Sequence, residues 1–155
     1  MSENVLFRRA LTRAMAQCSR REYCIYEIRN KLLLWGLEDS DSEKIITILV
    51  KENFINETRY AKAFVKDKFR YNRWGKVKTS ALLKSKYIPA DLINSALESI
   101  DSETYTKSLR DLIEGHKRSV KAKNQYDLKA KLMRYGLSKG YESSLLYDIL
   151  NNLEE

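Results

Sequence analysis

The chain has 155 residues, of which 43% are apolar, and a formal net charge of +8. This length accommodates one domain or one short array of repeats, and the single Pro and five Gly are too few turn residues for a β-sandwich. The excess of positive charge favours an anionic partner, with nucleic acid ahead of an acidic protein or a membrane surface.

The hydrophobic pattern predicts helices along the whole chain and no strand, because useful runs of alternating apolar and polar residues are absent. Capping boxes are expected at residues 19–22 (SRRE) and 40–43 (SDSE), and Asn56 is expected to cap the helix that follows it. The predicted helices span residues 4–17, 20–35, 42–53, 57–71, 74–86, 89–100, 103–118, 124–135 and 141–153.

A seven-residue phrase occurs twice, as KLLLWGL at residues 31–37 and as KLMRYGL at residues 131–137. In each copy the glycine, Gly36 or Gly136, can take the left-handed conformation that ends a helix, and the following leucine can fold back onto the last turn. Apolar residues recur nine and thirteen positions after the glycine, as Ile45 and Leu49 in one copy and as Leu145 and Ile149 in the other.

LLKSKYI, at residues 82–88, is a degenerate middle copy with Tyr87 in place of the glycine. Pro89 follows directly, and it can stop this helix and take the first position of the next one. The apolar residues that keep the pattern are Leu83, Ile88, Ala96 and Ile100. Three copies about 50 residues apart predict an all-α fold, in which tandem three-helix repeats form an elongated, curved array. We expect one domain over residues 1–155, with an N-terminal helix at 4–17 and approximate repeats at 19–71, 72–122 and 123–155.

The sequence carries no recognisable catalytic or cofactor site. It has one histidine, His116, and neither a phosphate-binding GxxxxGK[ST] loop nor a Gly-rich dinucleotide turn. Acid pairs such as Asp39 and Asp41 are interpreted as helix-start charges. We therefore expect no enzyme, no cofactor and no metal site. No apolar run is long enough for a signal-peptide core or a membrane span, which predicts a cytoplasmic protein without membrane contact.

Positive charge is concentrated in two segments. Residues 61–88 contain nine Lys or Arg and a single acid, Asp67, and residues 117–134 form a second basic run. A basic stripe of this kind can follow a phosphate backbone. The residues expected to contact nucleic acid or a protein partner are Lys66, Arg70, Arg73, Lys76, Lys78, Lys84, Lys86, Lys121, Lys123, Lys131 and Arg134. The aromatic residues within the first segment, Tyr71, Trp74 and Tyr87, either belong to the core or stack on bases.

The order and spacing of these phrases resemble the RecX family. In SRREYCIYEIRNKLLLWGL the matching positions are Ser19, Glu27–Ile28, Lys31–Leu32 and Gly36–Leu37. The phrase INETRYA, at residues 55–61, resembles the family's Leu-x-Asp-x-x-Phe-Ala run, with Tyr60 in place of Phe. In the next phrase, which begins WGKVKTSALLKSKYI, Gly75 and Leu83 fit the family pattern, whereas Thr79 stands at an aliphatic position and Tyr87 at a glycine.

The resemblance implies an elongated, curved all-α protein of tandem three-helix repeats, without catalytic residues or a cofactor. It implies binding to the RecA recombinase filament on DNA and restraint of its ATPase, strand-exchange and coprotease activities. The expected partners are therefore RecA and the single-stranded DNA within its filament, and a monomer is expected. One alternative is a general helical nucleic-acid-binding module that acts without RecA. Others are a repeat scaffold for a different acidic protein, and a nuclease, for which the sequence shows no cluster of metal ligands.

Overall fold

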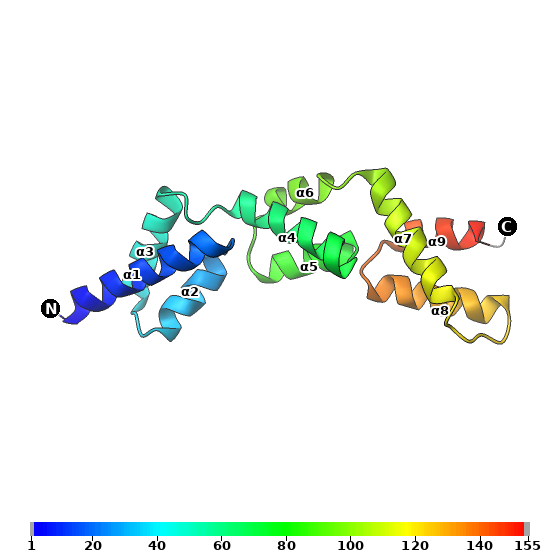
Figure 1. Cartoon of the computed structure of the whole chain (residues 1–155), viewed down its shortest axis with the longest axis horizontal. Coiled ribbons are helices and arrows are strands. Elements are labelled where there is room, and N and C mark those ends of the chain that lie inside the picture. The colour runs from blue at the N-terminus through cyan, green and yellow to red at the C-terminus, as the bar shows by residue number, and fades with distance from the viewer. Residues whose placement is uncertain (1, 154–155) are drawn as a thin grey trace.

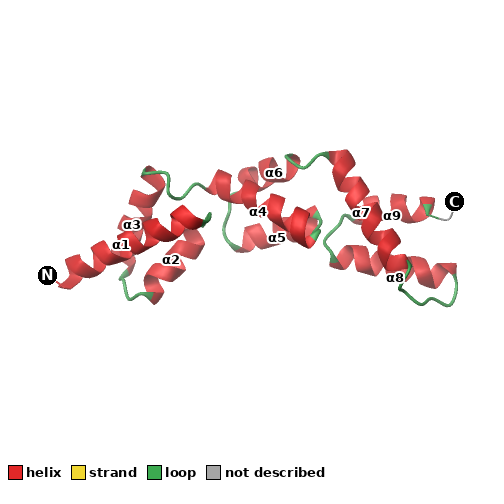
Figure 2. Cartoon of the chain, viewed as in Figure 1, coloured by secondary structure: helices red, strands yellow, loops and turns green. Residues whose placement is uncertain are grey.

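The computed structural model describes residues 2–153, which form nine helices and no strand (Figures 1 and 2). The helices are α1 (Ser2–Arg20), α2 (Ile25–Leu34), α3 (Asp39–Lys51), α4 (Glu57–Asn72), α5 (Lys76–Ser85), α6 (Ala90–Glu98), α7 (Ser102–Lys117), α8 (Gln125–Ser138) and α9 (Ser143–Asn152). The predicted all-α fold and the existence of each predicted helix are confirmed.

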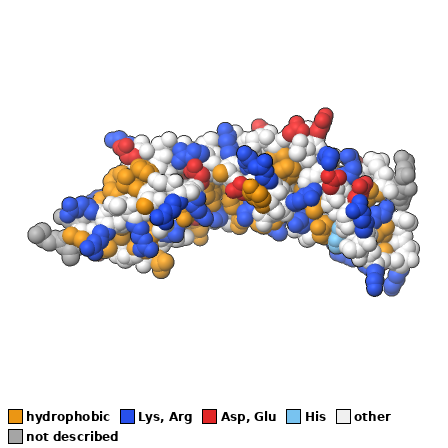
Figure 3. Space-filling view, viewed as in Figure 1, with side chains coloured by type: hydrophobic (Ala, Val, Ile, Leu, Met, Phe, Trp, Pro, Cys, Tyr) orange, Lys and Arg blue, Asp and Glu red, His pale blue; other side chains and the backbone are white. Residues whose placement is uncertain are grey.

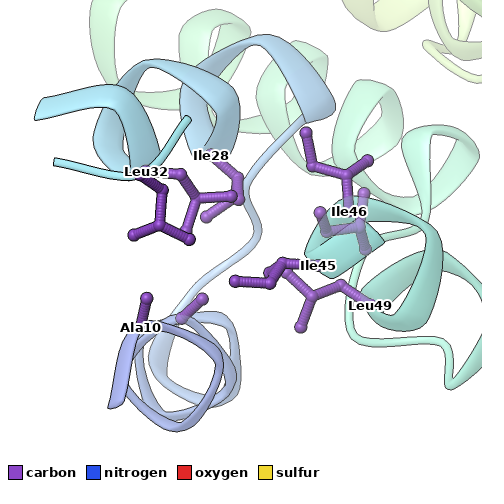
Figure 4. Packing of buried hydrophobic residues seen from close by; sticks show 9 residues of the cluster. Ala10, Ile28, Leu32, Ile45, Ile46 and Leu49 are labelled. Carbon is purple, nitrogen blue, oxygen red and sulfur yellow. The ribbon is translucent and has the colours of Figure 1, made fainter. Parts of the chain in front are cut away.

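The helices form three successive bundles along a gently curved rod (Figure 1). Buried apolar side chains form three separate clusters, mainly from α1–α3, from α4–α6 and from α7–α9. We call these the first, second and third bundles. Figure 4 shows the first cluster, in which Ala10 of α1, Ile28 and Leu32 of α2, and Ile45, Ile46 and Leu49 of α3 point toward one another. Burial of these apolar faces is the main source of stability for such short helices.

The second helices of the three bundles lie one after another along the lower edge of the rod in Figure 1. The N-terminus of α5 contacts the C-terminus of α8, where Gly75 and Val77 donate backbone hydrogen bonds to the carbonyls of Lys139 and Gly140. The C-terminus of α5 in turn meets the N-terminus of α2, where Lys86 and Glu27 form an ion pair. The first helices, α1, α4 and α7, lie in front in this view.

Gly36 ends α2 as predicted. Its φ is +94°, and the N–H groups of Gly36 and Leu37 donate to the carbonyls of Leu33 and Leu32, which is the Schellman arrangement. The middle copy closes in the same way, because Tyr87 has a φ of +60° and the N–H of Ile88 donates to the carbonyl of Leu83. The sequence alignment of these two copies therefore also holds in the structure.

The prediction that Gly136 ends the third repeat helix was wrong. This glycine is buried inside α8, and the Schellman close lies four residues later, at Gly140, whose φ is +92°. Counted from Gly140, Gly136 takes the place that Leu32 and Leu83 occupy in the other copies. A Cβ at Gly136 would overlap Leu146, so the side chain of Leu146 fills the space that a leucine at position 136 would need.

The two capping boxes were also wrong. Ser19 lies in the last turn of α1, where its hydroxyl donates to the carbonyl of Met15, and α2 starts only after Cys24. The carboxylate of Glu27 accepts from the backbone N–H of Cys24 instead. In the second case α3 begins at Asp39, three residues before the predicted start.

The predicted N-cap at Asn56 is confirmed, because its side chain accepts from the N–H of Arg59 at 3.0 Å. Pro89 immediately precedes α6, one position earlier than predicted. The repeat limits at 19–71, 72–122 and 123–155 remain a prediction about the sequence. They are out of phase with the hydrophobic clusters by one helix, since each predicted repeat starts near the second helix of a bundle.

Candidate partner-binding surface

The second and third helices of the three bundles differ in net charge. The second helices, α2, α5 and α8, together contain eight Lys or Arg and two acids. Both of these acids, Glu27 and Asp127, are ion-paired to lysines. The third helices, α3, α6 and α9, contain two Lys and six acids. Opposite charges are therefore segregated to different sides of the rod.

The space-filling view shows the same segregation (Figure 3). Lys and Arg side chains are distributed over the full length of the visible face, whereas Asp and Glu side chains are absent from its lower edge. This lower outline is hollowed in the middle, and the row α2–α5–α8 lies along it in Figure 1. We call the exposed side of these three helices the basic edge. An extended polyanion could lie along it without meeting an unpaired carboxylate of these helices.

Three of the predicted contact residues take part in the junction between the second and third bundles. Arg73 has a φ of +57°, and its guanidinium donates to the carbonyl of Ser108. The backbone N–H of Lys76 donates to the hydroxyl of Tyr105, and its ammonium group lies 4.8 Å from the centre of that ring. These contacts give Arg73 and Lys76 a structural role. Lys78 is more exposed: its Nζ donates to the carbonyl of Ser138 on α8 at 3.4 Å and lies 4.6 Å from the ring centre of Trp74.

Two further predicted residues are held in ion pairs. Lys86 binds Glu27 at 2.7 Å across the junction of the first two bundles, and both side chains are largely covered. Lys131 binds Asp127 at 3.1 Å within α8, and its ammonium group also donates to the carbonyl of Lys121. Both cations are therefore partly neutralised before any partner arrives.

The remaining predicted residues are exposed and make no ion pair with a carboxylate among the described residues. These are Lys66, Arg70, Lys84, Lys121, Lys123 and Arg134. The structure does not gather them into one patch: Lys66 and Arg70 lie on α4, Lys84 and Arg134 on the second helices, and Lys121 and Lys123 in the loop between α7 and α8.

Sequence reasoning missed several exposed cations. Lys62 precedes Lys66 and Arg70 at intervals of four, so all three share one face of α4. On α1, Arg8, Arg9 and Arg13 line a shallow groove, and the guanidinium of Arg13 lies 4.1 Å from the ring centre of Trp35. The run RRALTR was visible in the sequence. It fell outside the two segments with the highest density of charge.

The three aromatic residues left open by the sequence differ in environment. Trp74 is half-buried, with the ammonium groups of Lys68 and Lys78 about 5 Å from its ring centre. Tyr71 and Tyr87 are 74% and 77% exposed. Neither tyrosine belongs to the core, so their rings are available to a partner.

A cleft of about 520 Å³ lies between the first and second bundles, lined by Glu22, Glu27, Tyr60, Phe64, Asp67, Arg21, Lys68 and Lys86. Burial raises the pKa of Glu27, but hydrogen bonds from Lys86 and from the backbone of Cys24 lower it more, so the carboxylate is ionised at neutral pH. Burial raises the pKa of the Cys24 thiol to about 11. Three acidic and three basic side chains line the cleft, so it has no excess of positive charge to attract an anion. We interpret it as the joint between the two bundles.

Within residues 2–153 no cluster of three or more His, Cys, Asp or Glu side chains is arranged to hold a metal ion. His116, in the last turn of α7, stacks on the ring of Tyr135 with 3.8 Å between the ring centres. None of the described helices has the length and apolar character needed to cross a membrane.

Comparison with known proteins agrees with this architecture. The family model for the second three-helix domain of RecX matches residues 56–97, which contain α4–α6 almost completely. The regulatory protein RecX of Vibrio campbellii is 30% identical over 128 residues, a match that covers 83% of this chain and 81% of that protein. That of Clostridium beijerinckii is 33% identical over 129 residues, covering 82% of this chain and 60% of that protein. The chain thus spans about 60% of the length of its clostridial relatives.

Two solved structures share the fold. A crystal structure of RecX from Lactobacillus salivarius matches with a TM-score of 0.83 at 18% identity, over 97% of this chain and 98% of that chain. A second crystal structure, of a regulatory protein RecX, matches with a TM-score of 0.87 at 19% identity, over 97% of this chain and 74% of that chain. With the similarity in sequence to the Vibrio protein over most of both chains, the conclusion is that this chain belongs to the RecX family of regulatory proteins.

Proposed function

We propose that this chain is a non-catalytic regulator that binds the RecA–DNA filament and restrains its ATPase, strand-exchange and coprotease activities. The proposal rests on the membership of the RecX family and on one observation of the molecule itself. That observation is the basic edge, a row of three helices along a curved rod with no unpaired carboxylate. Such a regulator would act in DNA recombination, DNA repair and the SOS response, in the bacterial cytoplasm.

The shape of the molecule suggests how it would act. A rod of three bundles can lie in the groove of a nucleoprotein filament and contact several protomers at once (Figure 1). Weak contacts in each bundle add up on a polymer, whereas a free protomer engages only one of them. Bound in this way, the monomeric rod would hinder filament extension and the movements that accompany ATP turnover.

The eleven cations predicted from the sequence divide into two groups under this proposal. The exposed, unpaired members (Lys66, Arg70, Lys84, Lys121, Lys123 and Arg134) and Lys78 would meet the DNA or acidic surfaces of RecA. The others, Arg73, Lys76, Lys86 and Lys131, would hold the rod in the shape that presents them.

The direct test is the RecA ATPase on single-stranded DNA, titrated with this protein at substoichiometric ratios. Inhibition at such ratios supports the proposal, because each bound rod affects several protomers. A rate that falls only as far as competition for free DNA explains would favour the alternative, a nucleic-acid-binding module that acts without RecA.

A pair of matched variants tests the basic edge. Lys84→Glu with Arg134→Glu reverses two unpaired cations on the second helices, whereas Lys44→Glu with Lys51→Glu reverses two exposed lysines of the acidic helix α3. The first pair should abolish most of the inhibition and the second should leave it nearly unchanged, with equal helicity by circular dichroism. If both pairs of substitutions changed the inhibition equally, the basic edge would have no specific role in it.

A further inference from the structure

Tyr87 lies just beyond the C-terminal end of α5 and is one of three described residues other than glycine with a positive φ, together with Asn53 and Arg73. Tyr87 has a φ of +60° at the position where the other two repeat copies have Gly36 and Gly140, with φ values of +94° and +92°. A residue with a Cβ is held in this conformation at a cost of about 1 kcal/mol. The cost is not offset by burial, because 77% of the tyrosine surface remains exposed.

The ring of Tyr87 lies beside a second tyrosine. The centre of its ring is 5.3 Å from that of Tyr26, and the two planes are tilted by 52°. Tyr26 belongs to α2 and packs against the core of the second bundle, so it is itself held in place. The strained backbone thus presents an exposed aromatic face, supported from one side, at the junction of the first two bundles.

The surface that leads to Tyr87 is basic. Helix α5 contains Lys76, Lys78 and Lys84 and no acid. Lys78 and Lys84 are exposed, with small residues such as Ala81 and Ser85 between or beside them, and neither lysine forms an ion pair with a carboxylate among residues 2–153. The ammonium group of Lys78 lies against the ring of Trp74 and within 3.4 Å of the carbonyl oxygen of Ser138. The exposed side of α5 therefore offers two cations to the phosphates of a strand, and Tyr87 adds an aromatic ring just beyond its C-terminal end.

We propose that Tyr87, supported by Tyr26, stacks on a base of single-stranded nucleic acid whose phosphates lie against Lys78 and Lys84. Aromatic side chains interleaved with cations bind single strands in this way, and each stacked base contributes about a fivefold gain in affinity at the lower end of the measured range. The inference rests on the proposed function, since it assigns the contact with the DNA strand of the filament to the middle of the basic edge.

The test compares Tyr87→Phe with Tyr87→Leu. Both variants keep a Cβ and an apolar side chain at the strained position, but only the phenylalanine keeps a ring. Binding is measured by fluorescence anisotropy to a labelled oligothymidylate and to an abasic oligonucleotide of the same length, which has the same phosphates and no bases. The wild type and Tyr87→Phe should prefer the oligothymidylate about fivefold, and Tyr87→Leu should lose this preference.

Tyr147→Leu serves as the control, because Tyr147 is 60% exposed but lies on α9, which has no cation. It should keep the preference for bases. Equal binding of the wild type to both oligonucleotides would overturn the proposal. If Tyr87→Leu then weakened the inhibition of RecA, the ring would contact a RecA side chain instead.

The same samples separate this inference from the proposed function. A wild type that inhibits the RecA ATPase but shows no preference for bases overturns only the stacking at Tyr87. A wild type that prefers bases at Tyr87 but leaves the RecA ATPase unchanged supports the stacking and overturns the proposed regulation of RecA.

Discussion

The Nζ atom of Lys86 lies 2.7 Å from the Oε2 atom of Glu27, which joins the C-terminal end of α5 to the N-terminal end of α2. The hydroxyl of Tyr60 donates to the same carboxylate oxygen, and the guanidinium of Arg21 approaches it at 3.5 Å. The carboxylate therefore links groups from four segments at the joint between the first two bundles. The second joint is different, because backbone hydrogen bonds from Gly75 and Val77 form part of it.

The first prediction concerns this ion pair. Lys86→Met should lower the free energy of unfolding by about 1 to 3 kcal/mol, because it leaves a covered carboxylate short of a hydrogen-bond donor. Urea denaturation measures the loss. Lys131→Met removes a cation from a less covered pair within α8 and should cost less, since that pair joins neighbouring turns of one helix. Equal losses of unfolding free energy in the two variants would mean that the ion pair across the joint stabilises the protein no more than the pair within α8.

The pH dependence of the same pair follows from the pKa of Glu27, which lies below its usual value of 4.5 in the folded protein. A lowered carboxyl pKa contributes stability above the unfolded value, and this contribution is lost as the pH falls through the folded value. Unfolding experiments between roughly pH 3 and pH 7 should therefore show a shallower acid decline for Lys86→Met than for the wild type. If the unfolding free energies of the two proteins fell in parallel with pH, Lys86 would not be the group that lowers the pKa of Glu27.

Two glycines with the same backbone conformation should respond differently to alanine. Gly36→Ala introduces a Cβ at a φ of +94° with nothing within 4 Å, so only the conformational cost of about 1 kcal/mol is expected. Gly140→Ala has the same cost, and its Cβ would also overlap Lys78 across the joint between the second and third bundles. The loss should exceed that of Gly36→Ala by about 1 to 3 kcal/mol.

Gly115→Ala is the control for these two substitutions. This glycine lies inside α7 with open space around its Cβ position, so alanine should raise the free energy of unfolding by about 0.5 to 1 kcal/mol. If Gly36→Ala and Gly140→Ala gave the same loss, the close contact at the second joint would be absent in solution.

A third prediction concerns Leu146 of α9, whose side chain occupies the space beside Gly136 of α8. Gly136→Ala should destabilise the third bundle by about 1 to 3 kcal/mol, because the new Cβ overlaps Leu146. Leu146→Ala should cost about 2 to 5 kcal/mol through the cavity it leaves. The double variant should lose clearly less than the sum, since each change relieves the other. Additive losses in urea denaturation would show that the two residues do not share the space.

A fourth prediction concerns salt. If Lys84 and Arg134 each neutralise a phosphate of a single strand, Lys84→Ala with Arg134→Ala should reduce the slope of log K against log salt by about 1.4, or about 0.7 per contact. Lys44→Ala with Lys51→Ala, on helix α3, should leave the slope unchanged. The slope is obtained from anisotropy titrations at several salt concentrations. A slope that does not change in the first pair would exclude both residues from the phosphate contact.

Much of the fold follows from local sequence. The helices follow from apolar periodicity and from the scarcity of turn residues, the cap at Asn56 from a side chain that reaches its own helix, and the close at Gly36 from the conformational freedom of glycine. The same local logic placed Tyr87 in register with Gly36, although no glycine marks the position. All of these features depend on residues within a few positions of one another.

The tertiary structure decided the rest. The position that holds Leu32 and Leu83 in the other copies is a glycine at residue 136, because Leu146, ten residues later, fills the space beside it. Lys86 is neutralised because Glu27, 59 positions away, meets it across a joint, whereas Lys84, two residues earlier, forms no ion pair with any carboxylate that the structure describes. The sequence determined that the chain is a basic array of helical repeats. Which cations are available to a partner depends on contacts between bundles, because ion pairs between distant residues exist only once the bundles are packed.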